Sequence, residues 1–250
     1  MFEASHARLP SGEPNPGNAL DVHELNAFYD RAQILHGVTL SVGRGEAVAL
    51  LGRNGAGKST CLRAMMGLVN RSGVICVDGH DLSGLDTPRI ARAGLGYVPE
   101  ERRIFADLTV MENLEVGRRA PRPGLAPWTV ERVFALFPNL AAMRGRLGGR
   151  MSGGEQQMLA LARTLMGNPS VLLLDEPSEG LAPLIVEQMA RAILALKMEG
   201  VSLLLSEQNF HFARLLCTRC YGLSGGRVVY SGLLETLGSD HRLREALLSI

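Results

Sequence analysis

The sequence predicts an α/β fold built on a parallel sheet, and three patterns support this prediction. A glycine-rich loop at residues 52–60 stands between a buried-strand pattern and a helix pattern. From Ser152 onward, helix patterns alternate with apolar strand patterns at 171–174 and 201–205. Alternation of this kind is typical of parallel strands that are covered by helices. The third pattern is a pair of alternating runs near the amino terminus, which predicts a separate antiparallel β subdomain.

The glycine-rich loop fits the phosphate-binding pattern of two glycines five residues apart, followed by lysine and a hydroxyl residue. It reads Gly52-Arg53-Asn54-Gly55-Ala56-Gly57-Lys58-Ser59-Thr60. The glycines let successive N–H groups point at one anion. Lys58 would reach the β- and γ-phosphates, Ser59 would offer its hydroxyl to Mg²⁺, and Thr60 would contact phosphate. A strand at 46–51 and a helix at 60–67 supply the expected context, so a P-loop NTPase core is favoured over a turn that binds nothing.

The amino-terminal part is expected to contain a leader and a hairpin. Residues 1–20 are rich in proline, glycine and polar residues, which predicts a disordered leader before a domain at 21–250. Residues 22–29 and 34–42 alternate apolar and polar side chains around a polar turn, which predicts a β-hairpin.

The middle of the chain, about residues 85–149, is expected to be a helical insert. It is richer in arginine, proline and glycine than its surroundings and has shorter helical patterns, at 110–116 and 129–137. Beyond it, long helices are predicted up to Met166 and from Pro183 to Met198. The insert would therefore interrupt an otherwise alternating α/β core.

Composition excludes some classes of protein. The net charge is +1, so a dominant attraction to nucleic acid is not expected. No apolar run approaches the roughly 20 residues that a membrane-spanning helix needs. The CxxC at Cys217 and Cys220 lacks two further ligands nearby, so the four cysteines are interpreted as reduced and structural rather than as a metal or redox site.

Two adjacent carboxylates follow the apolar strand at 171–174. Beside a phosphate-binding loop, Asp175 would hold Mg²⁺, which prefers oxygen ligands. Glu176 would orient and deprotonate the attacking water. The alternative, a turn at the end of a strand before Pro177, is disfavoured because the phosphate-binding loop is also present.

Ser152-Gly153-Gly154-Glu155 opens the helix that runs to Met166. Ser152 and Glu155 have the spacing of a capping box, which would be a purely structural role. The two glycines also bare the backbone N–H groups of a helix start, which favours an anion. A second phosphate-binding surface without a lysine suggests that this one serves a nucleotide held by another subunit.

Together, in this order, these motifs resemble the ATP-binding subunits of ABC transporters, from about residue 21 to the end. The resemblance implies an ABC ATPase that binds ATP and Mg²⁺, in which two such domains enclose two ATP molecules head to tail. It implies that Tyr29 stacks on adenine, the alternative being an ordinary strand aromatic. It also implies that Ser178–Pro183 crosses to the partner's site, the alternative being a plain turn.

Two positions depart from the common ABC pattern. Glu100 stands where glutamine is usual, and Gln208 stands where histidine is usual. Glu100 keeps an oxygen for Mg²⁺ or water, and Gln208 keeps a neutral hydrogen-bond donor for the γ-phosphate. With Asp175-Glu176-Pro177-Ser178-Glu179-Gly180, the set is similar to the second, LivF-type ATPase of branched-chain amino-acid importers.

The resemblance also implies partners. A second, LivG-type ATPase subunit and two permeases are expected, with a periplasmic binding protein acting indirectly. The chain would lie at the cytoplasmic face of the inner membrane, touching the membrane only through the permeases. The alternatives are a related importer of urea, amides or aromatic acids, a lipid exporter, and an ABC ATPase without a transport role.

Overall fold

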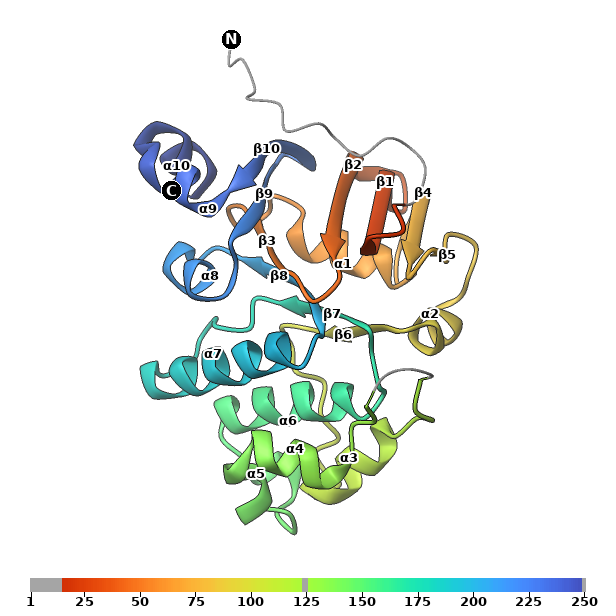
Figure 1. The fold of residues 1–250 in the computed structure, drawn as a ribbon, viewed down its shortest axis with the longest axis vertical. Coiled ribbons are helices and arrows are strands. Elements are labelled where there is room, and N and C mark those ends of the chain that lie inside the picture. Colours follow the sequence, from red (N-terminus) through yellow and green to blue (C-terminus); the bar gives the residue numbers. More distant parts are fainter. Residues whose placement is uncertain (1–14, 123–125, 249–250) are drawn as a thin grey trace.

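The computed structural model describes residues 15–122 and 126–248 (Figure 1). Within them the strands form a four-stranded sheet, in the order β2-β1-β4-β5, and a six-stranded sheet, in the order β10-β9-β3-β8-β7-β6. The longer helices are α1 (Lys58–Met65), α3 (Val110–Gly117), α6 (Gly153–Leu165), α7 (Pro183–Met198) and α10 (His241–Leu248). The shorter ones are α2 (Thr87–Ala93), α4 (Val130–Leu136), α5 (Pro138–Ala142), η1 (Gly148–Arg150), α8 (Phe210–Leu216) and α9 (Leu234–Ser239).

The four-stranded sheet is antiparallel and contains the predicted hairpin. Its strands are β1 (Asn18–Tyr29), β2 (Ala32–Gly43), β4 (Asn70–Val77) and β5 (His80–Asp81). Tyr29 pairs with Ala32 at the hairpin turn. The first strand starts earlier than the sequence suggested, inside the proposed leader, because Leu20 is fully buried and pairs with both neighbouring strands. Residues 1–14 of that leader lie outside the described residues.

The six-stranded sheet is the predicted parallel core. Its strands are β3 (Ala47–Leu51), β6 (Leu95–Val98), β7 (Val171–Asp175), β8 (Ser202–Glu207), β9 (Arg219–Ser224) and β10 (Arg227–Leu233). All neighbouring pairs from β6 to β9 are parallel, and β10 adds an antiparallel edge. The α/β fold class with an antiparallel subdomain is therefore confirmed.

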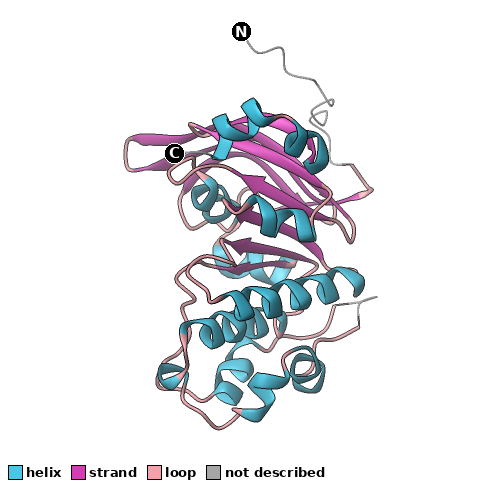
Figure 2. Ribbon diagram, turned by 90° about the vertical axis from the view of Figure 1, so that its left-hand side faces the viewer, coloured by secondary structure: helices cyan, strands magenta, loops and turns pink. Residues whose placement is uncertain are grey.

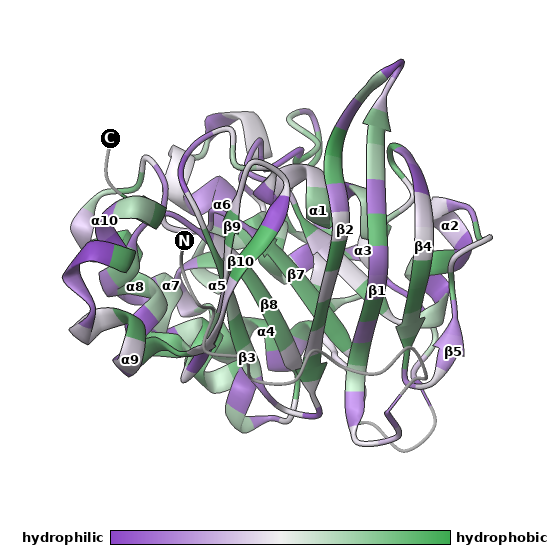
Figure 3. Ribbon diagram, turned by 90° about the horizontal axis from the view of Figure 1, so that it is seen from above, coloured by the Kyte–Doolittle hydropathy of each residue, from purple (hydrophilic) through white to green (hydrophobic). Residues whose placement is uncertain are grey.

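Alternate residues of the central strands enter two different hydrophobic clusters. Ala47, Ala49 and Leu51 pack on the side of α6, α7 and α8. Val48 and Leu50 pack with α1 and the antiparallel sheet. The core sheet therefore separates α1 from α6. The helices α6, α7 and α8 lie on one side of it, and α1 and the four-stranded antiparallel sheet lie on the other (Figure 2). Seen from above, the central strands are largely hydrophobic (Figure 3).

The segment expected as a helical insert, residues 85–149, is not entirely helical. It includes β6, which pairs with β7 and belongs to the core sheet. The sequence hides this strand because Leu95-Gly96-Tyr97-Val98 is short and contains a glycine. The helical part proper contains α3, α4, α5 and η1, and it packs on α6. Within the described residues, every helix is too short or too polar to span a lipid bilayer.

Candidate active site

The carboxyl ends of three parallel strands bring the motif residues together. Leu51, the last residue of β3, is in register with Glu207 of β8, and Asp175 of β7 is in register with Ser206. Ligands of open α/β sheets bind beyond these strand ends. The phosphate-binding loop, the Asp175-Glu176 pair and the segment around Gln208 therefore share one edge of the sheet.

The phosphate-binding loop joins β3 to α1 as predicted, but α1 begins at Lys58, earlier than the expected residue 60. Gly57 caps the helix in a left-handed conformation, with φ 105°. A side chain at Gly57 would be strained and would also meet Leu35 at 3.0 Å. Because the turn is made by Gly57, both Lys58 and Ser59 stand in the first helical turn, where N–H groups are free to bind an anion.

Lys58 is almost fully buried and is held by three oxygens. Its Nζ donates to the carbonyl oxygens of Gly52 at 2.8 Å and Arg53 at 3.1 Å. The same ammonium forms an ion pair with Oε1 of Glu176 at 3.0 Å. The lysine charge is therefore directed into the loop and is balanced by the carboxylate proposed as the base.

Asp175 is fully buried at the end of β7 and accepts three hydrogen bonds. Ser59 Oγ donates to Oδ1 at 2.9 Å, and Ser206 Oγ donates to the same oxygen at 2.6 Å. The hydroxyl of Tyr97 donates to Oδ2 at 2.9 Å. Burial and the charge of Asp175 raise the pKa of Tyr97 well above its usual range, so the phenol stays a donor. Sequence reasoning missed both residues: Ser206 lies one residue beyond the strand predicted at 201–205, and Tyr97 lies on β6, which the sequence did not indicate.

Glu176 has a left-handed backbone, with φ 46°. Its N–H donates to the carbonyl oxygen of Ser206 at 3.1 Å and to the Ser206 hydroxyl at 3.2 Å. These contacts fix the turn that directs the Glu176 carboxylate toward Lys58. A positive φ costs energy in a non-glycine residue, and such strain is concentrated at functional sites.

Glu100 follows β6 and faces the same edge of the sheet. Partial burial and the negative charges of Glu176 and Asp175 raise its pKa above the usual value. Glu179 has its pKa raised to about 7, first by a hydrogen bond with the Glu176 side chain and then by burial and the charges of Glu176 and Glu100. The site therefore concentrates carboxylates, and a cation there would relieve their repulsion.

Gln208 directly follows β8 and is half-buried. It stands between the fully buried Glu207 and Asn209, whose side chain caps α8 by accepting the Phe212 N–H at 3.1 Å. The strand end and the helix cap thus fix the backbone on either side of Gln208.

Tyr29 lies at the tip of the β1–β2 hairpin, and its side chain is 41% exposed. An open pocket of about 320 Å³ surrounds it, lined by Phe28, Tyr29, Asp30, Gly67, Leu68, Val69 and Asn70. An exposed ring beside an open pocket is suited to stacking on a flat base.

The Ser152–Glu155 motif lies elsewhere. Ser152 caps α6, and the capping box is complete: Oγ of Ser152 accepts the Glu155 N–H, and the Glu155 carboxylate accepts the Ser152 N–H at 2.7 Å. Among the described residues, no hydrogen bond or ion pair joins this motif to the phosphate-binding loop. Gly153 and Gly154 follow the cap, and a side chain at Gly153 would meet the Arg102 guanidinium at 2.6 Å. The two candidate anion-binding motifs therefore make no direct polar contact with each other within the described residues.

Comparison with known proteins decides the family. The sequence profile of the family described as "ABC transporter" matches residues 35–179. The high-affinity branched-chain amino acid transport ATP-binding protein BraG of Pseudomonas aeruginosa is 42% identical over 230 residues, which are 92% of this chain and 99% of BraG. The chain belongs to the ABC transporter family.

This ABC ATPase is also similar to an export-system protein and to a solved ATP-binding subunit. The lipopolysaccharide export system ATP-binding protein LptB of Haemophilus influenzae is 34% identical, covering 92% of this chain and 96% of LptB. A solved ATP-binding subunit of an ABC transporter superposes with a TM-score of 0.77 at 30% identity, covering 92% of this chain and 96% of that one. This chain is therefore an ATP-binding and ATP-hydrolysing subunit of a kind that works with permease subunits.

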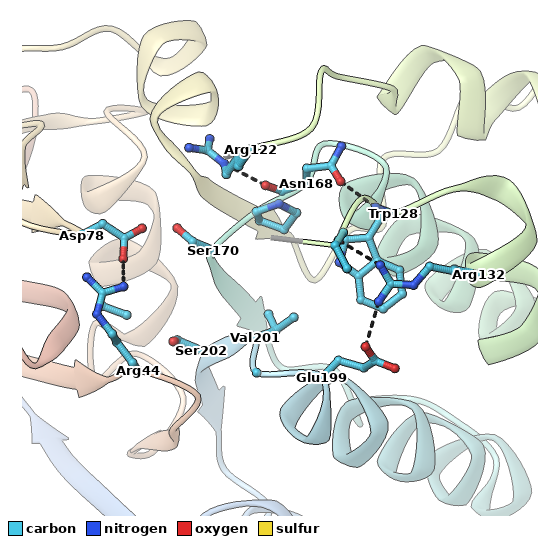
Figure 4. Close-up of a pocket in the computed structure, with 14 residues that line it drawn as sticks. Arg44, Asp78, Arg122, Trp128, Arg132, Asn168, Ser170, Glu199, Val201 and Ser202 are labelled. Carbon is cyan, nitrogen blue, oxygen red and sulfur yellow. Dashed lines mark hydrogen bonds and ion pairs between the residues drawn. The ribbon is translucent and has the colours of Figure 1, made fainter. Parts of the chain in front are cut away.

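The opposite edge of the core sheet of this ABC ATPase holds a cavity of about 460 Å³ (Figure 4). Arg122 donates to the carbonyl oxygen of Asn168 at 2.8 Å, and Arg132 pairs with Glu199 at 2.8 Å. The Arg132 guanidinium also lies 4.3 Å from the centroid of the Trp128 ring. These contacts join α4 and the segment before it to the turns that enter β7 and β8. The cavity lies where the strands begin, so it is distinct from the candidate nucleotide site.

The four cysteines of the ABC ATPase, Cys61, Cys76, Cys217 and Cys220, are all free and buried. Burial raises the pKa of Cys61, Cys217 and Cys220 to about 12. Reactivity requires the thiolate, so these three groups are inert thiols at neutral pH.

Proposed function

We propose that this chain is the ATPase subunit of an importer of branched-chain amino acids. The identity with BraG supports this most strongly, because it extends over nearly the whole of both chains. The likeness to LptB supports a lipopolysaccharide exporter as the second candidate. The importer is favoured because the identity with BraG is higher, and because Glu100 and Gln208 depart from the common ABC residues in the manner of the LivF-type subfamily.

The proposed assembly contains a second, LivG-type ATPase, two permeases and, indirectly, a periplasmic binding protein. The chain would sit at the cytoplasmic face of the inner membrane and touch the membrane only through the permeases. Related importers of urea, amides or aromatic acids remain within the same proposal, since the ATPase does not contact the cargo.

ATP binding is assigned first to the loop between β3 and α1. The backbone N–H groups of residues 52–60 would surround the phosphates, with Thr60 adding a hydroxyl. Lys58 would exchange the Glu176 carboxylate for the β- and γ-phosphates, which carry more charge. Tyr29 would stack on the adenine, for which its exposed ring supplies the surface.

The residues present fit a magnesium ion. The Ser59 hydroxyl and the Asp175 carboxylate lie 2.9 Å apart, and both are the oxygen donors that Mg²⁺ prefers. Glu100 adds a third oxygen on the same edge. When bound, Mg²⁺ would neutralise charge on the phosphate oxygens.

Hydrolysis is assigned to three side chains of this chain and to a motif of the partner. Glu176 would orient and deprotonate the attacking water, and Gln208 would contact the γ-phosphate through its neutral amide N–H. Glu100 would hold water or the metal. In the closed pair of ATPases, Ser152, Gly153, Gly154 and Glu155 would bind the nucleotide of the other subunit. Because γ-phosphate contacts exist only before hydrolysis, closure and opening follow the state of the nucleotide.

The decisive experiment is purification of the tagged chain from native membranes, followed by identification of its partners. Recovery of two permeases and a second, distinct ATPase, with leucine uptake lost when the chain is deleted, would support the importer. Recovery of lipopolysaccharide-export permeases would instead support the second candidate. Recovery of ribosomes or DNA-repair proteins without any membrane protein would overturn both.

The role of Gln208 can be tested separately. Because a neutral N–H donor is sufficient in this proposal, Gln208→His is expected to keep normal ATPase activity. Gln208→Ala removes the donor and is expected to abolish it. Steady-state phosphate release measures both variants, and unchanged activity in Gln208→Ala would refute the assigned role.

A further inference from the structure

A buried carboxylate at the end of β8 has no place in the roles assigned so far. Glu207 is 1% exposed, and the proposed nucleotide site uses its neighbours rather than Glu207 itself. A charged group is costly to bury unless hydrogen bonds compensate for the loss of water. The contacts that Glu207 makes should therefore indicate why a carboxylate occupies this position.

Each oxygen of Glu207 accepts a backbone N–H from a different segment. Oε1 accepts from Ser178 N at 3.2 Å, and Oε2 accepts from Asn209 N at 3.2 Å. Ser178 is itself buried, so its N–H depends on this carboxylate in place of water. Both bonds are to main-chain groups, so they fix the course of the backbone rather than the rotamer of a side chain.

The two segments are the ones that contain the proposed chemistry. Ser178 stands two residues after Glu176 and opens the loop that runs to Pro183. Asn209 follows Gln208 and begins α8. The hydrogen bond from Asn209 N to Glu207 Oε2 closes a short turn, and Gln208 is the residue between the two. One carboxylate therefore links the loop after the base to the loop that presents Gln208.

We propose that Glu207 is a positioning residue, which holds Gln208 in place for the γ-phosphate and ties its movement to the Ser178–Pro183 loop. This inference rests on the proposed function of Gln208. If Glu207 only stabilised the fold, its mutation would change the affinities for ATP and ADP alike. If Glu207 positions Gln208, its mutation changes only the affinity for the nucleotide that has a γ-phosphate.

The test compares the binding of two nucleotides to the full chain in the presence of Mg²⁺. Isothermal titration calorimetry would measure AMP-PNP, a non-hydrolysable ATP analogue, and ADP. Glu207→Ala removes both acceptors and is expected to weaken AMP-PNP binding about tenfold, with ADP affinity changed less than about twofold. Glu207→Gln keeps one acceptor oxygen, so its affinity for AMP-PNP should lie between that of the wild type and that of Glu207→Ala. In a Gln208→Ala background, Glu207→Ala should weaken AMP-PNP no further.

Leu204→Ala is the matched control, because Leu204 is fully buried on the same strand and packs in the core, away from both loops. It should lower stability while leaving the ratio of the two affinities unchanged. If Glu207→Ala weakens both nucleotides equally, or neither, while Gln208→Ala weakens AMP-PNP, the positioning role is overturned and the proposed function stands. If Gln208→Ala leaves AMP-PNP binding unchanged, the assigned role of Gln208 fails, and the positioning role fails with it.

Discussion

Lys58 and Glu176 neutralise each other in a nearly water-free site, 3.0 Å apart. Glu176→Gln removes the proposed base and the charge that competes with phosphate for Lys58. We expect kcat to fall by about 100- to 10,000-fold, while ATP binds at least as tightly. Phosphate release and nucleotide titration measure the two effects. Glu187→Gln, which removes an exposed carboxylate paired with Arg191, is the control and should behave as wild type. A kcat within threefold of wild type for Glu176→Gln would contradict the role of base.

Glu207 also gives a prediction about pH. Burial raises its pKa from 4.5 to about 7, with help from the charge of Glu176 and against the hydrogen bonds from Ser178 and Asn209. The Glu207 carboxyl group therefore binds its proton more tightly in the folded state than in the unfolded state. As a result, the free energy of unfolding falls as the pH rises from 4.5 through 7. Relative to Glu207→Gln, the wild type should lose on the order of 3 kcal/mol across this range. Urea unfolding at pH 5 and pH 7.5 measures the difference, and parallel stabilities at the two pH values would disprove it.

For single residues, the sequence predicts those site residues that belong to a contiguous motif. The positions of Lys58, Ser59 and Asp175 follow from spacing, and the structure brings these three together. Tyr97 and Ser206 contact the same carboxylate, but they come from strands whose register with β7 is set by tertiary pairing. A pattern along the chain does not contain that register, so these partners could not be predicted from it.

The start of α6 has two roles that can be separated by mutation. Ser152 caps the helix and, in the proposed function, contacts the partner's nucleotide. Ser152→Asp keeps a good capping side chain but places a negative charge before the γ-phosphate, so stability should persist and ATPase activity should be lost. Ser152→Ala should lower the free energy of unfolding by about 1 kcal/mol. Thermal unfolding and phosphate release measure each variant; an active Ser152→Asp protein would leave the serine only its structural role.

The sequence predicts helices and strands best where a long periodic pattern begins or ends at a clear boundary residue. Pro183–Met198 forms a helix with the expected bounds, since proline suits a first turn. The sequence does not distinguish β6 from the predicted helical insert, because its four residues are too few to show a period. The helix pattern predicts the start of α1 at residue 60, two residues late, because the left-handed cap at Gly57 is a backbone property that the pattern does not reveal.

For the whole molecule, the proposed function predicts a composite site, because the phosphate-binding loop and the Ser152 motif make no polar contact within the described residues of one chain. If each ATP contacts the loop of one chain and the motif of another, the γ-phosphate contributes directly to association. Glu176→Gln with ATP should therefore co-elute with the LivG-type subunit as a dimer on size exclusion with light scattering. ADP should leave the subunits apart. Co-elution that does not depend on the nucleotide would contradict a site shared in this way.

The burial of all four native thiols makes the chain a convenient carrier for spectroscopic labels. Maleimide and methanethiosulfonate reagents attack thiolates at the surface, so the wild-type protein should remain almost unlabelled under native conditions. A single cysteine introduced at an exposed position, such as Met198, which is 87% exposed, would then accept a spin label or fluorophore without prior removal of the natural ones. Distances between two ATPase subunits could thus be followed through the transport cycle in a chain that keeps its own core intact.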